Sequence, residues 1–298
     1  MSKSKPIITV IGSINMDMVT TTVRVPEQGE TVMGEGFRTM PGGKGANQAV
    51  AAARLGAEVH MIARVGEDSF GKELQSHLKE QNVNIDNVEP VTDNHTGVAT
   101  IVLSERDNRI IVSAGANYDV TPDYIMQHLA IIDRSDIVIV QLEIPIETVE
   151  CVTGYCKEKG VPILLNPAPA HRLSPAILDA VTYLTPNEKE RDEMELDRET
   201  YKEKLIVTLG EKGVSYLTDD LAEEILPGYK VDVVDTTGAG DTFNGALAVA
   251  LGRQMKMKDA IQYANAAAAL SVQKFGAQGG MPTDEEVRDF LAERAHAE

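Results

Sequence analysis

Short apolar runs alternate with helix-like segments along most of the chain. Continuous apolar runs are typical of strands buried on both faces. Runs that are continuous or nearly so occupy residues 7–11, 59–63, 137–142, 161–165 and 205–209. Segments with helical spacing of small or apolar residues occupy 46–55, 244–251, 260–274 and 284–295. This alternation indicates a parallel sheet with right-handed crossovers. We therefore predict an α/β fold with a Rossmann-like, doubly wound, mostly parallel sheet flanked by helices.

Two stretches depart from this pattern, at about 15–40 and 95–113. Both alternate between β-branched and polar residues, which is typical of exposed β ribbons rather than core strands. The second stretch predicts a hairpin with its turn at Asp107 and Asn108. We expect the two stretches to pair into a small antiparallel sheet within a single domain that spans residues 1–298.

The sequence Asp-Thr-Thr-Gly-Ala-Gly-Asp-Thr-Phe at 235–243 separates a β-like run at 229–234 from a helix. Gly238 and Gly240 are therefore predicted where a strand ends and a helix begins. Backbone N–H groups at a helix start are unpaired, and the helix dipole adds positive charge there. The junction predicts an anion-binding hole. Asp241 lies at its mouth, either as a helix cap or as a catalytic base.

A second glycine-rich stretch, Pro-Gly-Gly-Lys-Gly-Ala-Asn-Gln-Ala, occupies residues 41–49 before a small-residue helix. It is not a Walker A loop, because Gly45 rather than Ser or Thr follows Lys44. Lys44 is either an ordinary surface lysine or a contact to substrate or phosphate. Its place beside a helix start, after paired glycines, favours the second interpretation.

Polar side chains follow two of the predicted strands. Asn15 and Asp17 come just after the first strand, and Glu143 follows the strand at 137–142. Ligands of open α/β sheets bind at the carboxyl ends of the strands, which favours a binding role for all three. The alternatives are turn residues for Asn15 and Asp17 and a surface position for Glu143.

The chain is acidic, with a formal net charge of -18 and a pI of about 4.8. This charge argues against binding to nucleic acid, which requires a basic face. An anionic substrate would have to meet local positive features such as a helix N-terminus, a lysine or a metal. Cys151 and Cys156 have neither a redox nor a zinc-binding spacing. With no signal-peptide pattern and no apolar run long enough to span a membrane, we expect a cytoplasmic protein.

The two glycine-rich stretches, in this order, resemble the two signatures of the pfkB family of carbohydrate kinases. The nearer match is to its ribokinases and covers nearly the whole chain. The resemblance implies ATP-dependent phosphorylation of D-ribose at O5, with Asp241 as base. The implied anion hole comprises Gly238, Ala239 and Gly240. The implied sugar site comprises Asn15, Asp17, Gly43, Lys44, Asn47, Glu143 and Asp241. The small β sheet would be a lid through which two copies form a homodimer.

The resemblance also implies a nucleotide site and two cation sites. The nucleotide residues would be Asn187, Thr208, Gly210, Gly213, Gly240 and Asn265. Asn187 and Glu190 match an Asn-x-x-Glu motif associated with Mg²⁺ and phosphate. A K⁺ activator would lie beside Asp235, Thr237, Ser271, Lys274, Gly276 and Gly280, with Gly280 in place of the usual serine. The alternatives are a solvated first helical turn at 187–190, a water-facing Asn265, and a plain strand end and turn at Asp235 and Thr237.

One segment departs from the family pattern. Residues 191–204 leave room for one helix, where ribokinases usually carry a pair. Two rival functions also remain open: a kinase of another sugar or nucleoside, and a catalytically silent, nucleotide-responsive binding protein. A Rossmann dehydrogenase is disfavoured because no Gly-x-Gly-x-x-Gly follows the first strand.

Overall fold

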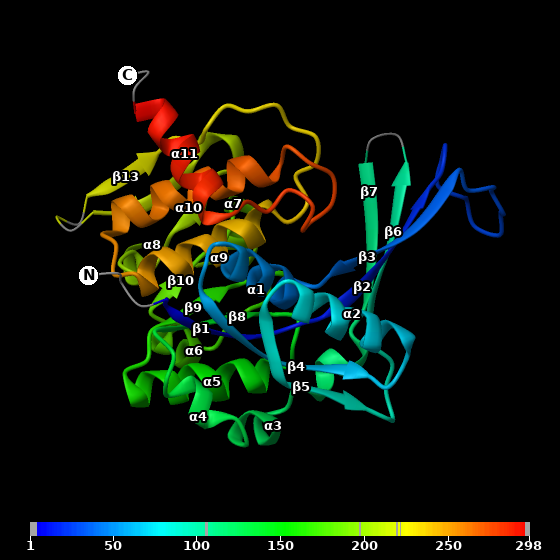
Figure 1. Ribbon diagram of the computed structural model, residues 1–298, viewed down its shortest axis with the longest axis horizontal. Coiled ribbons are helices and arrows are strands. Elements are labelled where there is room, and N and C mark those ends of the chain that lie inside the picture. The colour runs from blue at the N-terminus through cyan, green and yellow to red at the C-terminus, as the bar shows by residue number, and fades with distance from the viewer. Residues whose placement is uncertain (1–4, 105–106, 197, 219, 221, 296–298) are drawn as a thin grey trace.

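A six-stranded parallel sheet forms the centre of the protein, as a computed structural model shows for residues 5–104, 107–196, 198–218, 220 and 222–295. Its order is β10-β9-β8-β1-β4-β5 (Figure 1). The strands are β1 Ile7–Ile11, β4 Glu58–Gly66, β5 Val83–Val91, β8 Ile137–Gln141, β9 Ile163–Asn166 and β10 Tyr183–Leu184. The chain builds outward from β1 to β5 and then returns to β8 on the other side of β1. This confirms the doubly wound sheet and places its switch point between β1 and β8, where ligands bind in such folds.

Helices cover both faces of this sheet, because successive side chains of its strands point to opposite sides. In β8, Ile137 and Ile139 pack into one core, and Val138 and Val140 pack into the other. The first core is covered by α1 Lys44–Arg54, α2 Ser69–Glu80, α9 Ala239–Gly252, α10 Met257–Ser271 and α11 Asp284–Ala295. The second is covered by α3 Pro122–Met126, α4 Leu129–Ile132, α5 Ile146–Lys159 and α6 Pro175–Ala180 (Figure 1).

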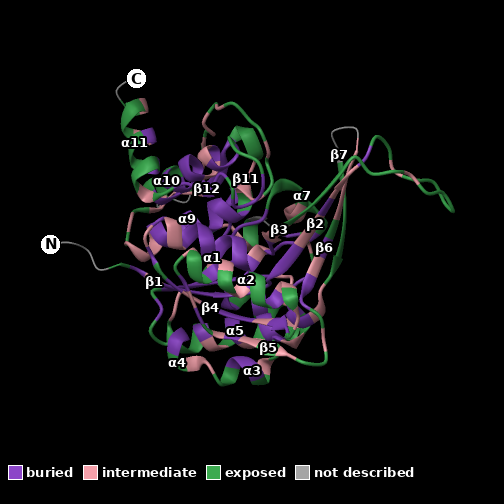
Figure 2. Cartoon of the chain, turned by 45° about the vertical axis from the view of Figure 1, so that its right-hand side comes forward, coloured by how far each residue is buried: buried purple, intermediate pink, exposed green. Residues whose placement is uncertain are grey.

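A second sheet of four strands projects from the carboxyl end of β1 (Figure 1). Its order is β3-β2-β6-β7, with bounds Asn15–Thr21 for β2, Gly36–Gly42 for β3, Gly97–Ser104 for β6 and Asp107–Ser113 for β7. The outer pairs are antiparallel, whereas β2 and β6 run parallel at the centre. We call this sheet the lid. Figure 2 shows that its outer end is largely exposed, in contrast to the buried central strands.

The predicted hairpin turn at Asp107 and Asn108 is wrong. Both residues lie in β7, where Asp107 pairs with Ser104 and Asn108 with Leu103. Residues 105 and 106, between the two strands, lie outside the described part of the chain. The Asp-Asn pair is a common turn sequence, but here both residues pair across to β6 as part of a strand.

Short elements fill the region between β10 and α9. They include α7 Glu188–Glu193, α8 Arg198–Tyr201 and a 3₁₀ turn at Gly210–Lys212, whereas another 3₁₀ turn, at Gly115–Asp119, lies between β7 and α3. A three-stranded antiparallel sheet joins β11 Val207–Thr208, β12 Val214–Leu217 and β13 Glu223–Leu226. Residues 191–204 thus hold the end of α7 and the four-residue α8, where one helix was predicted. Each of these two helical pieces is shorter than the single helix predicted for this segment.

The β-like run at 229–234 is not a strand, contrary to the sequence prediction. Val233 and Val234 are exposed, so the alternating pattern does not correspond to a buried face. The N–H groups of Val234 and Asp235 both donate to the carbonyl of Val272, at 2.8 and 3.1 Å. The segment that leads into α9 is therefore a loop tied to the end of α10.

Two further features concern the cysteines and the apolar character of the helices. Cys151 and Cys156 both lie on α5 as free thiols, and burial raises the pKa of Cys156 to about 12. Among the described helices, none has the length and apolar character needed to cross a membrane.

Candidate active site

The N-terminus of α9 is shaped by Gly238. This residue has a φ of 78° and is the N-cap of the helix, so it brings no side chain to bond the first-turn N–H groups. A Cβ at this position would lie 2.5 Å from the carbonyl oxygen of Ala277. The N–H of Ala239 donates to the carbonyl of Thr236 at 3.2 Å, whereas those of Gly240 and Asp241 lie in the first turn, which a helix cannot pair internally.

Asp241 is buried beside this helix start and is held by two amides from α1. Asn47 Nδ2 donates to its Oδ2 at 2.9 Å, and Gln48 Nε2 donates to its Oδ1 at 3.0 Å. The carboxylate is thus directed across to α1 rather than back onto its own helix, which argues against the helix-cap alternative. Burial raises the pKa of Asp241 above its ordinary value, against the opposing effects of Lys44 and the two amides. A raised pKa makes this carboxylate a stronger base than an exposed aspartate.

Two more carboxylates face Asp241. Burial, together with the charges of Glu143 and Asp241, raises the pKa of Asp17 to about 7. Burial opposes the charged form of Lys44, but the carboxylates of Asp241, Glu143 and Glu190 outweigh it and raise the pKa of the lysine. The cluster therefore offers one ammonium donor and several carboxylate acceptors, a set that suits a neutral ligand with many hydroxyl groups.

The early glycine-rich loop is packed directly against these acids. A Cβ at Gly42 would lie 2.3 Å from Asp17 Oδ2, and Gly43, with a φ of 91°, lies against the backbone of Asn15. Glu143 Oε2 accepts hydrogen bonds from the Ser13 hydroxyl and from the Lys44 N–H, the latter at 3.1 Å. The loop thus joins the ends of β1 and β8 at the switch point of the sheet.

Asn15 is oriented by a residue that sequence reasoning did not single out. Asn117 Nδ2 donates to Asn15 Oδ1 at 2.7 Å, and the N–H of Ile14 donates to Asn117 Oδ1 at 2.9 Å. Asn117 is 1% exposed and lies beside Gly97. With its oxygen occupied, Asn15 directs its Nδ2 donor elsewhere, in keeping with a role in binding a hydroxyl.

Apart from Gly240, which lies in the first turn of α9, the predicted nucleotide residues fall into two groups. Asn187 and Thr208 lie side by side through a backbone bridge, next to the turn between Gly210 and Gly213. Gly213 has a φ of 104°, and a Cβ there would lie 1.9 Å from the carbonyl oxygen of Leu226. Asn265 lies separately on α10. It is 8% exposed, and its Nδ2 has no hydrogen-bond partner among the described residues, so the water-facing alternative is wrong.

Asn187 and Glu190 form a capping box at the start of α7. The N–H of Glu190 donates to Asn187 Oδ1 and the N–H of Asn187 donates to Glu190 Oε2, both at 2.8 Å. Asn187, Glu188 and Lys189 are exposed, as in the alternative of a solvated first turn, whereas Glu190 is half-buried and burial raises its pKa. Within the described residues there is no group of three or more acidic, His or Cys side chains placed to hold a metal. Mg²⁺ in phosphoryl-transfer sites usually takes only one or two carboxylates plus phosphate oxygens, so Glu190 fits such a role.

Asp235 joins two loops beside the start of α9. Its Oδ1 accepts from the Thr237 N–H and hydroxyl at 3.0 and 2.7 Å, and its Oδ2 accepts from the Gly276 N–H at 2.9 Å. These bonds lower the pKa of Asp235 in spite of the opposing effect of burial. Gly280 lies against Ser271, because a Cβ at Gly280 would be 1.9 Å from the Ser271 carbonyl oxygen. The backbone at Gly280 therefore leaves no room for a side chain. Lys274 is exposed on the same loop.

Comparison with known proteins agrees with this arrangement. The model of the pfkB family carbohydrate kinases matches residues 5–284. The chain belongs to the pfkB family of carbohydrate kinases. It is 50% identical to the ribokinase of Bacillus subtilis over 291 residues, which cover 96% of this chain and 99% of that one. It is 35% identical to a deoxyribokinase of Salmonella typhi over 302 residues, covering 96% and 98% of the two chains. The structure of Arabidopsis thaliana ribokinase complexed with ribose and ATP superposes with a TM-score of 0.88 at 32% identity, covering 96% of this chain and 98% of that one. The fold of the chain is therefore ribokinase-like.

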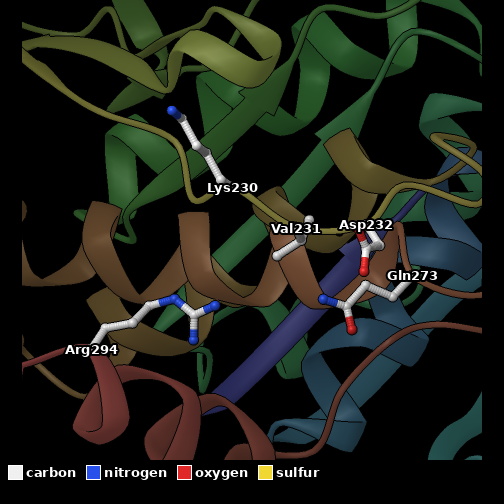
Figure 3. A pocket seen from close by; sticks show the side chains of 5 residues that line it. All are labelled: Lys230, Val231, Asp232, Gln273 and Arg294. Carbon is white, nitrogen blue, oxygen red and sulfur yellow. The ribbon is translucent and has the colours of Figure 1, made fainter. Parts of the chain in front are cut away.

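Another pocket of this pfkB-family chain lies outside the cluster described above. It is lined by Lys230, Val231, Asp232, Gln273 and Arg294 (Figure 3). Its two cationic side chains do not converge on one point, and the Arg294 guanidinium lies 3.5 Å from the centre of the Phe290 ring. None of the predicted site residues lines it, so we place the active site at the Asp241 cluster instead.

Sequence reasoning missed the residues that support the site from behind. Ser13, Gln48, Asn117 and Gln278 all hydrogen-bond a predicted site residue. The signal available for Gln48 was a long polar side chain inside an alanine-rich helix, which has to find partners if it is buried. For Asn117 the sequence carried no comparable signal.

Proposed function

We propose that this chain transfers the γ-phosphoryl group of ATP to the 5-hydroxyl of D-ribose. The observation that carries the proposal is the buried Asp241, held by two amide donors next to the glycine-capped start of α9. The ribokinase similarity over nearly the full chain supports ATP and ribose as substrates. The deoxyribokinase similarity is weaker but makes 2-deoxyribose the nearest rival substrate.

The chain's own groups account for most of the chemistry. Phosphoryl transfer has a loose transition state, so catalysis depends mainly on positioning and on stabilising charge. The N–H groups of Gly240 and Asp241 stabilise the phosphoryl oxygens, with Gly238 shaping their orientation. Asp241 accepts the proton of the attacking hydroxyl. Mg²⁺, when bound with the nucleotide, neutralises phosphate charge, and Glu190 with Asn187 would hold it.

Ribose recognition falls to the groups around Asp17. The carboxyls of Asp17 and Glu143 accept hydrogen bonds from hydroxyl groups, and the amides of Asn15 and Asn47 can donate to them. Gly43 and Lys44 close the loop over the sugar. Thr208, Gly210, Gly213 and Asn265 receive the nucleotide, and the unpartnered Asn265 amide supports that assignment.

A coupled assay of ADP release tests the substrate assignment. We expect D-ribose to give the highest kcat/KM in a panel of pentoses, 2-deoxyribose, hexoses and nucleosides. A preference for 2-deoxyribose or for a nucleoside would make that compound the substrate, with the same residues in the same roles. Absence of ADP release with every compound would favour the silent binding protein.

We also propose that K⁺ activates the enzyme from the loop that contains Asp235. Carboxylate and carbonyl oxygens of Asp235, Ser271 and Gly276, with Thr237, provide the hard oxygen donors that such a cation takes. Because Asp235 also bonds Thr237 and Gly276, a cation there stiffens the segment that leads into α9. Gly280 offers no side-chain oxygen, so a carbonyl or water fills that position.

We expect K⁺ to raise kcat by about tenfold over Na⁺ or choline at equal ionic strength, equivalent to about 1.4 kcal/mol of transition-state stabilisation. Asp235→Ala is expected to remove the difference between the salts. The measurement is kcat of K⁺-free protein in each salt at saturating ATP and ribose. Equal rates in all three salts would contradict a K⁺ site.

A homodimer through the lid is the third part of the proposal. Among the described residues, no strand pairs with the outer side of β3 or of β7. Phe37, Ile110, Ile111 and Val112 expose between about half and three-quarters of their surface. Exposed edges and an apolar face of this kind are suited to cover by a second copy.

We expect Ile111→Asp to halve the molecular mass measured by light scattering, because a charge in the interface would be desolvated. Ile225→Asp is the matched control, since Ile225 is 56% exposed on β13 in a different sheet. The control should remain dimeric. A dimer that survives Ile111→Asp would argue against the lid as the interface.

A further inference from the structure

Two series of buried side-chain amides converge on Asp241 from opposite sides. In the first, Gln141 Nε2 donates to Gln48 Oε1 at 2.7 Å, and Gln48 Nε2 donates to Asp241 Oδ1. Gln48 Nε2 also donates to Asn166 Oδ1 at 3.0 Å, and Asn166 Nδ2 donates to the carbonyl of Thr185 at 3.2 Å. Gln48 and Gln141 are 0% exposed, so neither is held in place by water.

The second series reaches the other oxygen of the same carboxylate. Gln278 Nε2 donates to Asn47 Oδ1 at 2.9 Å, and Asn47 Nδ2 donates to Asp241 Oδ2. His77 Nε2 lies 2.7 Å from Gln278 Oε1. Since that oxygen can only accept, His77 carries its proton on Nε2 in this contact.

The direction of every bond in the two series follows from Asp241. An ionised carboxylate only accepts, so Gln48 and Asn47 have to turn their NH₂ groups toward it. Their amide oxygens then point away and require donors, which Gln141 and Gln278 supply. An amide flip at any member would place two oxygens or two NH₂ groups together. The arrangement therefore holds one rotamer of Asp241 in its ionised form.

Apolar side chains could fill this volume without the cost of burying amides. Gln48 and Gln141 lie on α1 and β8, elements whose other inward residues are largely aliphatic. The amides are needed only if the carboxylate at the end of the series has to keep a fixed orientation.

We propose that Gln48 and Gln278 are positioning residues for the catalytic base. Gln48 acts directly on Asp241, and Gln278 acts through Asn47, so that the remaining lone pairs of the carboxylate face the attacking hydroxyl. This role rests on the proposed phosphoryl transfer. Gln141 and His77 fix the orientation of the two glutamines.

Gln48→Leu tests the first series with little change in volume. We expect kcat to fall about 10–10²-fold, the effect of a misplaced reacting group, with the KM for ATP unchanged within twofold. Loss of a donor to the ionised form raises the pKa of Asp241 further, so the acid limb of the kcat profile moves to higher pH. Gln278→Leu should shift the same limb by a smaller amount, measured at saturating K⁺.

The pH dependence of unfolding provides a readout that does not need activity. The pKa of Asp241 is higher folded than unfolded, so its ionisation lowers stability as pH rises through that window. In Gln48→Leu the pKa of Asp241 in the folded protein is higher still, so this pH window extends upward. The stability of the variant therefore falls further below that of wild type as pH rises. Other charged groups that face Asp241 are the same in both proteins, so they do not cause the difference between the two. These groups are Asp17, Lys44, Glu143 and Glu190.

Thr9→Val is the matched control, because it removes a buried hydroxyl pair with Ser135, 2.7 Å apart, from β1. It should lower stability equally at all pH values and leave kcat and its acid limb unchanged. If Gln48→Leu does not fold, Gln141→Leu makes the same test, since it removes the donor to the Gln48 amide oxygen.

The possible failures are distinguishable. If wild type phosphorylates ribose and Gln48→Leu keeps the wild-type kcat and acid limb, the positioning role is refuted. A Gln48→Leu deficit that is constant with pH, like that of Thr9→Val, also refutes it. If wild type itself has no activity on ribose, the proposed function fails, whereas a deficit that grows with pH would still support control of Asp241 by Gln48.

Discussion

Asp241→Asn is expected to lower kcat by roughly 10²–10⁴, the usual contribution of a positioned general base. The replacement is nearly isosteric, but its NH₂ group would face one of the two amide donors that hold the carboxylate. Affinities for ATP and ribose should change little, since most of their contacts lie elsewhere in the site. Rapid-quench kinetics with equilibrium binding of each substrate separates the two effects.

Asp284→Asn is the matched control for this variant. Asp284 lies on α11 and bonds Arg253 at 2.7 Å and the Tyr263 hydroxyl at 2.6 Å. Its replacement should reduce stability and leave kcat intact. If Asp241→Asn turned over ribose at close to the wild-type rate, Asp241 would not be the base, whatever its hydrogen bonds.

Gly238→Ala should produce the next largest loss, about 10²–10³ in kcat, comparable to the removal of one oxyanion donor. A Cβ here would lie 2.5 Å from the Ala277 carbonyl in a backbone conformation with a φ of 78°. The start of α9 has to move to relieve this contact, and the N–H groups of Gly240 and Asp241 move with it. Single-turnover rates at saturating substrates measure the effect.

Gly160→Ala is the matched control for Gly238→Ala. It separates the effect of a displaced anion hole on kcat from the stability cost of any non-glycine residue in a left-handed conformation. Gly160 ends α5 with a φ of 70° and has nothing within 4 Å of its added Cβ. We expect this control to lose roughly 1–2 kcal/mol of stability, as for other non-glycine residues in that conformation, with an unchanged kcat. Equal kinetic losses in the two variants would contradict a specific role for Gly238.

The sequence was sufficient for the parts of the site that follow from position along the chain. Asn15, Asp17 and Glu143 were placed together because the carboxyl ends of parallel strands meet at one edge of the sheet. Gly238 and Gly240 were placed at a helix start by local pattern. These inferences need the order of the elements but no knowledge of individual side-chain contacts.

Other features depended on packing between distant segments. The bond from Gln48 to Asp241 joins residues 193 positions apart, and no periodicity identifies such a pair. The run at 229–234 alternates like a strand, yet its backbone bonds the end of α10 instead of a ladder. The close approach at Gly280 is visible only in space, because the Ser271 carbonyl occupies the room that a side chain would need.

The most direct test of the central claim is the structure of the product. Purified protein is incubated with ATP, Mg²⁺, K⁺ and D-ribose, and the new phosphoester is recorded by proton-coupled ³¹P NMR. Transfer to O5 predicts a phosphomonoester signal split into a triplet by the two protons on C5, in one-to-one ratio with ADP. A doublet, which indicates an ester at C1, C2 or C3, or ADP formation without any sugar phosphoester, would contradict the account.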